Sequence, residues 1–118
     1  MANARLQRVE ANCKIIWGDH FEYDLDCETD DYIHFSYVVK RDFGTSFGPP
    51  LTMTGPCGSE EAAFKELDRM LGLWAAQVTR GTPMTREESL KIFGGPRGGQ
   101  RWILNRVWDT LEKREGAV

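Results

Sequence analysis

Residues 21–28 alternate strictly between apolar and acidic side chains, and this pattern constrains the fold more tightly than any other feature of the chain. The odd positions hold Phe21, Tyr23, Leu25 and Cys27, and the even positions hold Glu22, Asp24, Asp26 and Glu28. Because side chains two residues apart share one face of a β-strand, the pattern predicts a half-buried strand with an acidic outer face. The fold must therefore contain a sheet that turns one face toward a core.

Other alternating or turn-bounded runs predict further strands at residues 13–17, 32–40 and 51–54. Apolar residues then recur at helical spacing over residues 59–79, 85–93 and about 100–114. Ser59 and Thr85 are placed to cap the first two helices, with Glu88 at capping-box spacing after Thr85. Strands followed by helices indicate the α+β class. We expect an antiparallel β-meander of about four strands, followed by three helices packed on one sheet face.

The length of 118 residues fits one ordinary domain. We expect residues 1–12 to form a short arm or frayed helix, and residues 13–118 to form a single α+β domain. The chain holds 15 Lys and Arg against 18 Asp and Glu, for a formal net charge of −3. This balance makes a whole-chain electrostatic interaction with nucleic acid or an anionic membrane unfavourable.

The three cysteines include no closely spaced pair, which disfavours a disulfide framework and suits a reducing compartment. No apolar stretch is long enough for a signal peptide or a bilayer-spanning helix. We therefore expect a cytoplasmic or nuclear protein that does not associate with membranes.

The acidic face of the strand at residues 21–28 is the first candidate site. Such a row of carboxylates repels itself unless solvent, neighbouring cations or a partner screens it. It predicts a docking face for a basic partner or a weak divalent-ion site. The alternative is a solvated face that discourages edge-to-edge aggregation. The partner-binding candidates on this face are Glu22, Asp24, Asp26 and Glu28.

Three aromatic residues are candidate anchors for a partner. Phe43 and Phe47 lie in a segment rich in Gly and Pro, and Trp102 follows Arg101. Exposed aromatic side chains near arginine are typical of interface hot spots. Phe43, Phe47 and Trp102 therefore join the partner-binding candidates.

The glycine-rich segment 94–101 precedes the last expected helix and contains Arg97 and Arg101. Backbone N–H groups at a helix start, together with arginine donors, favour anions, so both arginines are anion-binding candidates. No strand precedes the glycines, so neither a P-loop nor a dinucleotide motif is matched. The alternative is a flexible connection between helices.

The sequence contains no recognisable catalytic set. Its two histidines show no triad spacing, and no cluster of N or S ligands is spaced for zinc. We therefore expect no catalytic residue, no metal site and no cofactor. An alternative prediction is a pocket between the sheet and the helices, which would bind a small molecule. Its candidate lining residues are Trp17, Tyr32, His34 and Tyr37.

The order of three strands and a helix over residues 21–79, with Gly55-Pro56-Cys57-Gly58-Ser59-Glu60-Glu61-Ala62-Ala63 at the last junction, resembles double-stranded-RNA-binding domains. In that family, lysines that clamp phosphates follow the serine position. Here Glu60 and Glu61 occupy those places, and carboxylates repel phosphates. The resemblance therefore implies a degenerate member without RNA activity, serving as a protein-interaction module.

These observations favour a non-enzymatic protein-interaction module with an acidic strand face and aromatic loop anchors. Its partner would be another protein or a second copy in a homodimer, with nucleic acid disfavoured. Two alternatives stay open. One is a small-molecule-binding protein or enzyme with a pocket between sheet and helices. The other is an RNA-binding module that uses the C-terminal arginines.

Overall fold

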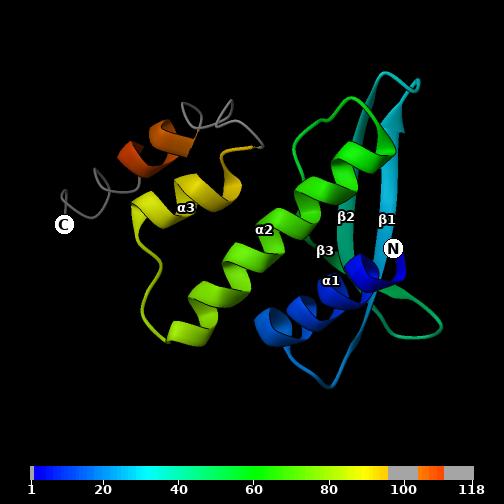
Figure 1. The fold of residues 1–118 in the computed structure, drawn as a ribbon, viewed down its shortest axis with the longest axis horizontal. Coiled ribbons are helices and arrows are strands. Elements are labelled where there is room, and N and C mark those ends of the chain that lie inside the picture. Colours follow the sequence, from blue (N-terminus) through cyan, green and yellow to red (C-terminus); the bar gives the residue numbers. More distant parts are fainter. Residues whose placement is uncertain (1, 96–103, 111–118) are drawn as a thin grey trace. The chain divides into compact units, whose positions relative to one another are not determined.

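The structure, a computed structural model, describes residues 2–95 and 104–110. Its elements are α1 (Ala2–Trp17), β1 (Glu22–Asp30), β2 (His34–Asp42), β3 (Phe47–Met53), α2 (Glu60–Arg80) and α3 (Arg86–Phe93). Residues 104–110 form one more helical segment. The sheet is antiparallel, with the strand order β1-β2-β3 (Figure 1). The predicted α+β class and antiparallel sheet are therefore confirmed.

The prediction of a strand at residues 13–17 is wrong, because these residues are the last part of α1. The apolar positions that enter the core are Val9, Cys13 and Ile16, and their spacing of four and three is helical. Alternation over only five residues did not distinguish the two periods. The described sheet consequently has three strands instead of about four, and residue 12 lies inside a continuous helix.

The chain divides into two compact units, Met1–Thr82 and Pro83–Val118. The first contains α1, the sheet and α2. In the second, the Arg86 guanidinium donates hydrogen bonds to Asn105 Oδ1 at 2.9 Å and to Asp109 Oδ1 at 2.8 Å. These bonds tie α3 to the segment 104–110. Thr85 and Glu88 form the predicted capping box at the start of α3.

The core of the first unit lies between the sheet and its two helices. Helices α1 and α2 lie on the same face of the sheet, which we call the inner face (Figure 1). The fully buried residues of this core are Val9 and Cys13 from α1, Val39 from β2, and Leu67 and Leu71 from α2. Tyr23 and Leu25 of β1 pack around them, as the alternation at residues 21–28 predicts.

An ion pair joins the two helices above this core. The Arg8 side chain of α1 donates two hydrogen bonds to the Asp68 carboxylate of α2, at 2.9 and 2.7 Å. Arg5 approaches the same carboxylate at 3.6 Å. A bidentate arginine–carboxylate pair fixes orientation as well as distance. It therefore sets how α1 lies along α2.

Leu71→Ala should lower the free energy of unfolding by about 3 kcal/mol, because it leaves a cavity in the closed core. Leu6→Ala is the matched control, since Leu6 is an exposed leucine on α1. It should cost less than about 1 kcal/mol. Urea denaturation measures both, and equal losses would contradict this placement of the core.

The Cys13 thiol should make the free energy of unfolding decrease as the pH becomes alkaline. Burial, with a smaller contribution from Glu10, raises the pKa of its thiol from 9.0 to about 12. Below pH 9 the contribution of the neutral, buried thiol to the free energy of unfolding is fully present. It is lost as pH rises toward 12, because the unfolded chain ionises first, at a slope of at most about 1.4 kcal/mol per pH unit. Denaturation at pH 8 and pH 10 should show a smaller loss for Cys13→Ala than for wild type.

Cys27→Ala is the control for this measurement, because Cys27 is only partly buried. Burial also raises the pKa of the Cys27 thiol, but this residue is less buried than Cys13, so the variant should keep most of the wild-type dependence on pH. The same loss of stability in both variants and wild type would contradict the role of Cys13.

Candidate functional site

The outer face of the sheet, which points away from α1 and α2, carries the predicted acidic row. Its side chains on β1 are Glu22, Asp24, Asp26, Glu28 and Asp30. The residues beside them in register on β2 are Asp42, Lys40, Val38, Ser36 and His34. On β3 the partners of β2 on this face are Phe47, Pro50 and Met53. The face is therefore acidic along β1 and largely apolar along β3.

The acidic row has few cations to balance it. Glu22 lies 4.0 Å from Lys14 Nζ, at the limit of an ion pair. Among residues 2–95 and 104–110, no ion pair is formed by Asp24, Asp26 or Glu28, although Lys40 is the register partner of Asp24. Uncompensated carboxylates on one strand favour a cationic ligand.

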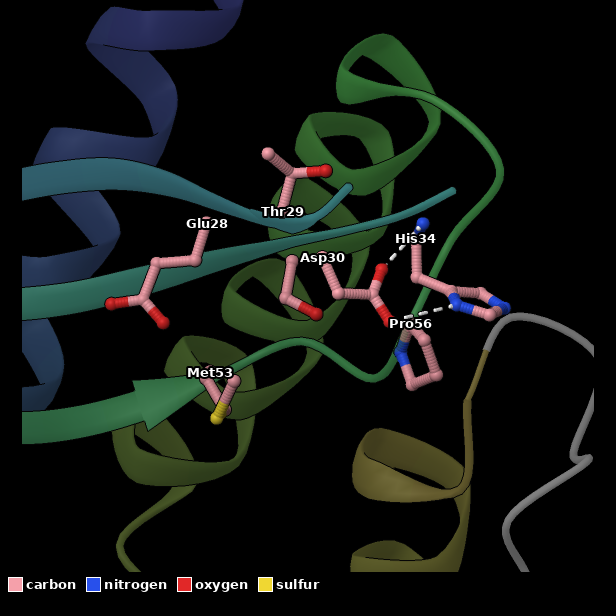
Figure 2. Close-up of a pocket in the computed structure, with 7 residues that line it drawn as sticks. Glu28, Thr29, Asp30, His34, Met53 and Pro56 are labelled. Atoms are coloured by element: carbon pink, nitrogen blue, oxygen red, sulfur yellow. Dashed lines mark hydrogen bonds and ion pairs between the residues drawn. The ribbon is translucent and has the colours of Figure 1, made fainter. Parts of the chain in front are cut away.

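Asp30 and His34 lie opposite each other at the end of this face where β1 ends and β2 begins (Figure 2). The backbone N–H of His34 donates to Asp30 Oδ1 at 2.8 Å, and the imidazole Nδ1 lies 3.2 Å from Oδ2. The backbone hydrogen bond is the largest cause that lowers the pKa of Asp30, and the imidazole contact adds to it. Asp30 is therefore held ionised, beside the hairpin that joins β1 and β2.

An open hollow of about 380 Å³ lies at this end of the outer face (Figure 2). Carboxylate, imidazole and hydroxyl groups line it together with a thioether and a proline ring. The lining residues are Glu28, Thr29, Asp30, His34, Ser36, Met53 and Pro56. Such a lining can hold the apolar stem of a long side chain and place its cationic head near carboxylates.

The four residues predicted to line a pocket between sheet and helices are not brought together. Only His34 borders the hollow, which opens on the outer face. Trp17 packs edge-on against Trp74, with ring centroids 5.0 Å apart. The Tyr37 hydroxyl donates to Glu60 Oε1 at 2.9 Å, and burial followed by this carboxylate raises its pKa to about 12. The fourth residue, Tyr32, lies at the hairpin tip.

The tip between β1 and β2 presents two large side chains to solvent. Tyr32 is 81% exposed and Ile33 is 65% exposed. Asp31 and Tyr32 have φ values of 51° and 62°, and the Ile33 N–H donates to the Asp30 carbonyl at 2.9 Å. Two successive positive φ values are typical of a type I′ turn. The sequence predicts a strand that begins at residue 32, but β2 begins at His34, so the exposure of this pair was missed.

The predicted aromatic anchors occupy the opposite end of the sheet. Phe43 is 54% exposed and packs edge-on against Phe21, with centroids 6.4 Å apart. Phe47 is 60% exposed and pairs with Asp42 on the outer face. The structure thus places Phe47 beside the acidic row, whereas Phe43 lies against Phe21. The remaining predicted anchor and the anion-binding candidates, Trp102, Arg97 and Arg101, lie outside the described residues.

The junction that resembles double-stranded-RNA-binding domains begins α2. Ser59 caps the helix, because its hydroxyl accepts a hydrogen bond from the Ala62 N–H at 3.1 Å. Glu60 accepts from the Tyr37 hydroxyl, and Glu61 lies 3.6 Å from Lys65. Carboxylates therefore stand at the helix start where the family has lysines.

Two further properties concern the part of the chain that the structure describes. Within it, His, Cys, Asp and Glu side chains form no group of three that could hold a metal ion. None of its helices combines the length and apolar character needed to cross a membrane.

A scan against protein-family models, a search of curated proteins and a search of solved structures find no match to this chain.

Tyr32→Asn should raise the free energy of unfolding by about 1 kcal/mol, because asparagine tolerates the left-handed conformation better than tyrosine does. Ile33→Asn is the matched control, since it introduces the same residue next to Tyr32 at a position without positive φ. It should not stabilise the protein. Thermal and urea denaturation measure both variants, and an equal change in both would exclude strain at Tyr32 as the cause.

Proposed function

We propose that this protein is a non-enzymatic interaction module whose outer sheet face binds a basic segment of a partner protein. The observation that carries the proposal is the unbalanced acidic row on this face. Asp24, Asp26 and Glu28 project from one strand, and no described cation pairs with them. Lysine or arginine side chains at matching spacing would supply the missing charges.

Apolar groups on the same face support binding of a polypeptide over binding of small cations. Phe47 and Met53 are exposed on β3, on the same face as the acidic row, whereas Val38 between them and that row is already buried. A peptide can cover such groups with its side-chain stems while its charged heads reach the carboxylates. We expect a short peptide on one sheet face to bind weakly and transiently, with a dissociation constant on the order of micromolar.

The alternative of RNA binding is disfavoured by charge. The acidic row repels phosphates, and Glu60 and Glu61 occupy the helix start where lysines would be needed. Duplex RNA is therefore a negative control, for which we expect no binding. Salt-dependent binding of duplex RNA would favour the RNA alternative over a protein partner.

The test is binding of a fluorescent nonapeptide that alternates lysine and threonine, measured by anisotropy. We expect binding that weakens as salt is raised, and no binding of the matching glutamate–threonine peptide. The triple variant Asp24→Asn, Asp26→Asn, Glu28→Gln should bind about tenfold more weakly, because it loses three charge pairs.

A variant with the same net charge serves as the control. Glu10→Gln, Glu61→Gln and Glu87→Gln together neutralise three exposed carboxylates on helices. This control should bind the lysine peptide as wild type does. Equal weakening in both triple variants would mean that only net charge matters, and would contradict a binding site on the outer face.

A further inference from the structure

We propose that the basic segment binds as a fourth, antiparallel strand along the free edge of β1. The inference rests on the proposed function and specifies how the partner is held. Addition of a strand to an exposed sheet edge supplies backbone hydrogen bonds, which give affinity without requiring a deep pocket. The acidic row of β1 then selects the side chains of the added strand.

The two edges of the sheet differ in their capacity to accept a strand. β3 is irregular, because its register with β2 shifts twice and it contains Pro49 and Pro50. Prolines and bulges are features that block pairing at an edge. β1 has neither feature, and its register with β2 is unbroken from Glu22 to Asp30. β1 is therefore the edge suited to pairing.

The hydrogen bonds of β2 establish which backbone groups of β1 point outward. Phe35 exchanges two backbone bonds of 2.9 Å with Cys57, and the Tyr37 carbonyl accepts from the Thr54 N–H at 2.9 Å. The backbone N–H and C=O groups of the odd residues of β2 thus point toward β3, and those of its even residues point toward β1. By the register, even residues of β1 bond to β2. The backbone N–H and C=O groups at the free edge belong to Tyr23, Leu25, Cys27 and Thr29.

These edge groups have no partner among residues 2–95 and 104–110. No backbone bond of the described chain reaches the N–H or C=O of Leu25 or Cys27 on this side. Helices α1 and α2 cover the inner face and leave β1 at the edge of the sheet (Figure 1). The unpaired groups repeat at every second residue, as an added strand requires.

Charge identifies the occupant as a basic segment and not a second copy of this chain. Antiparallel pairing of β1 with its own copy would set carboxylates opposite carboxylates on one face, and like charges directly opposite are destabilising. Opposite Asp24 and Asp26, an added strand forms the non-hydrogen-bonded pairs, in which Cα atoms are about 4.5 Å apart. Lysines there lie close to the carboxylates.

The experiment uses the lysine–threonine nonapeptide, which matches the nine residues of β1. In the antiparallel arrangement, the threonine N–H groups face β1 and the lysine N–H groups face solvent. N-methylation of the threonines should weaken binding at least tenfold, roughly, because it removes the bonds to β1. N-methylation of the lysines should change binding by no more than about twofold.

Amide hydrogen exchange of the full chain provides a second measurement that needs no substitution. Binding of the unmodified peptide should slow exchange at Leu25 and Cys27, whose N–H groups face the edge. It should leave Asp24 and Asp26 nearly unchanged, because these already bond to β2.

Equal binding of both methylated peptides, with unchanged exchange at Leu25 and Cys27, would overturn strand addition while leaving binding to the acidic face intact. Absence of binding by the unmodified peptide would overturn the proposed function as well. A concentration-dependent dimer that protects Leu25 and Cys27 without peptide would assign this edge to a second copy and refute the basic segment.

Discussion

The burial of one sheet face against two helices is the constraint on which the rest of the structure depends. Val39 of β2 is fully buried in this contact, in one cluster with residues of α1 and α2. Once Tyr23 and Leu25 join that core, the two-residue period of β1 leaves its carboxylates on the opposite face. The acidic surface is thus a consequence of the hydrophobic core.

The position of α1 depends on contacts between elements far apart in the sequence. Val9 and Cys13 fill the space beside α2, and the Arg8–Asp68 pair orients one helix on the other across sixty residues of chain. Residues 13–17 show a weak alternation that fits a strand locally. The helical arrangement prevails because it buries Cys13 and Ile16 on the same side as Val9.

The acidic face and the free edge are two consequences of the same strand. β1 is regular and unprotected, whereas β3 carries prolines and register shifts. Charged side chains on an edge strand discourage pairing between identical copies. The same charges attract a basic strand, so one feature opposes self-association and favours a partner of opposite charge.

The sequence alone determined the period of most elements, and residues 13–17 of α1 are the exception. It located the strand with the acidic row, the long amphipathic helix after Ser59 and the capping box of Thr85 and Glu88, because these signals are local. It did not locate the exposed turn at Tyr32 and Ile33, since the apolar alternation of β2 continues into the tip. The four residues predicted to share a pocket, Trp17, Tyr32, His34 and Tyr37, are separated in the structure. The direction in which each side chain points depends on how the elements pack, which the local sequence does not determine.

Only the tertiary structure decided which strands form the edges, which backbone groups stay unpaired and where the hollow opens. These properties arise from pairings between residues distant in the chain. A residue's own neighbours in sequence fix its preferred backbone conformation, but they carry no information about which other segment will lie beside it.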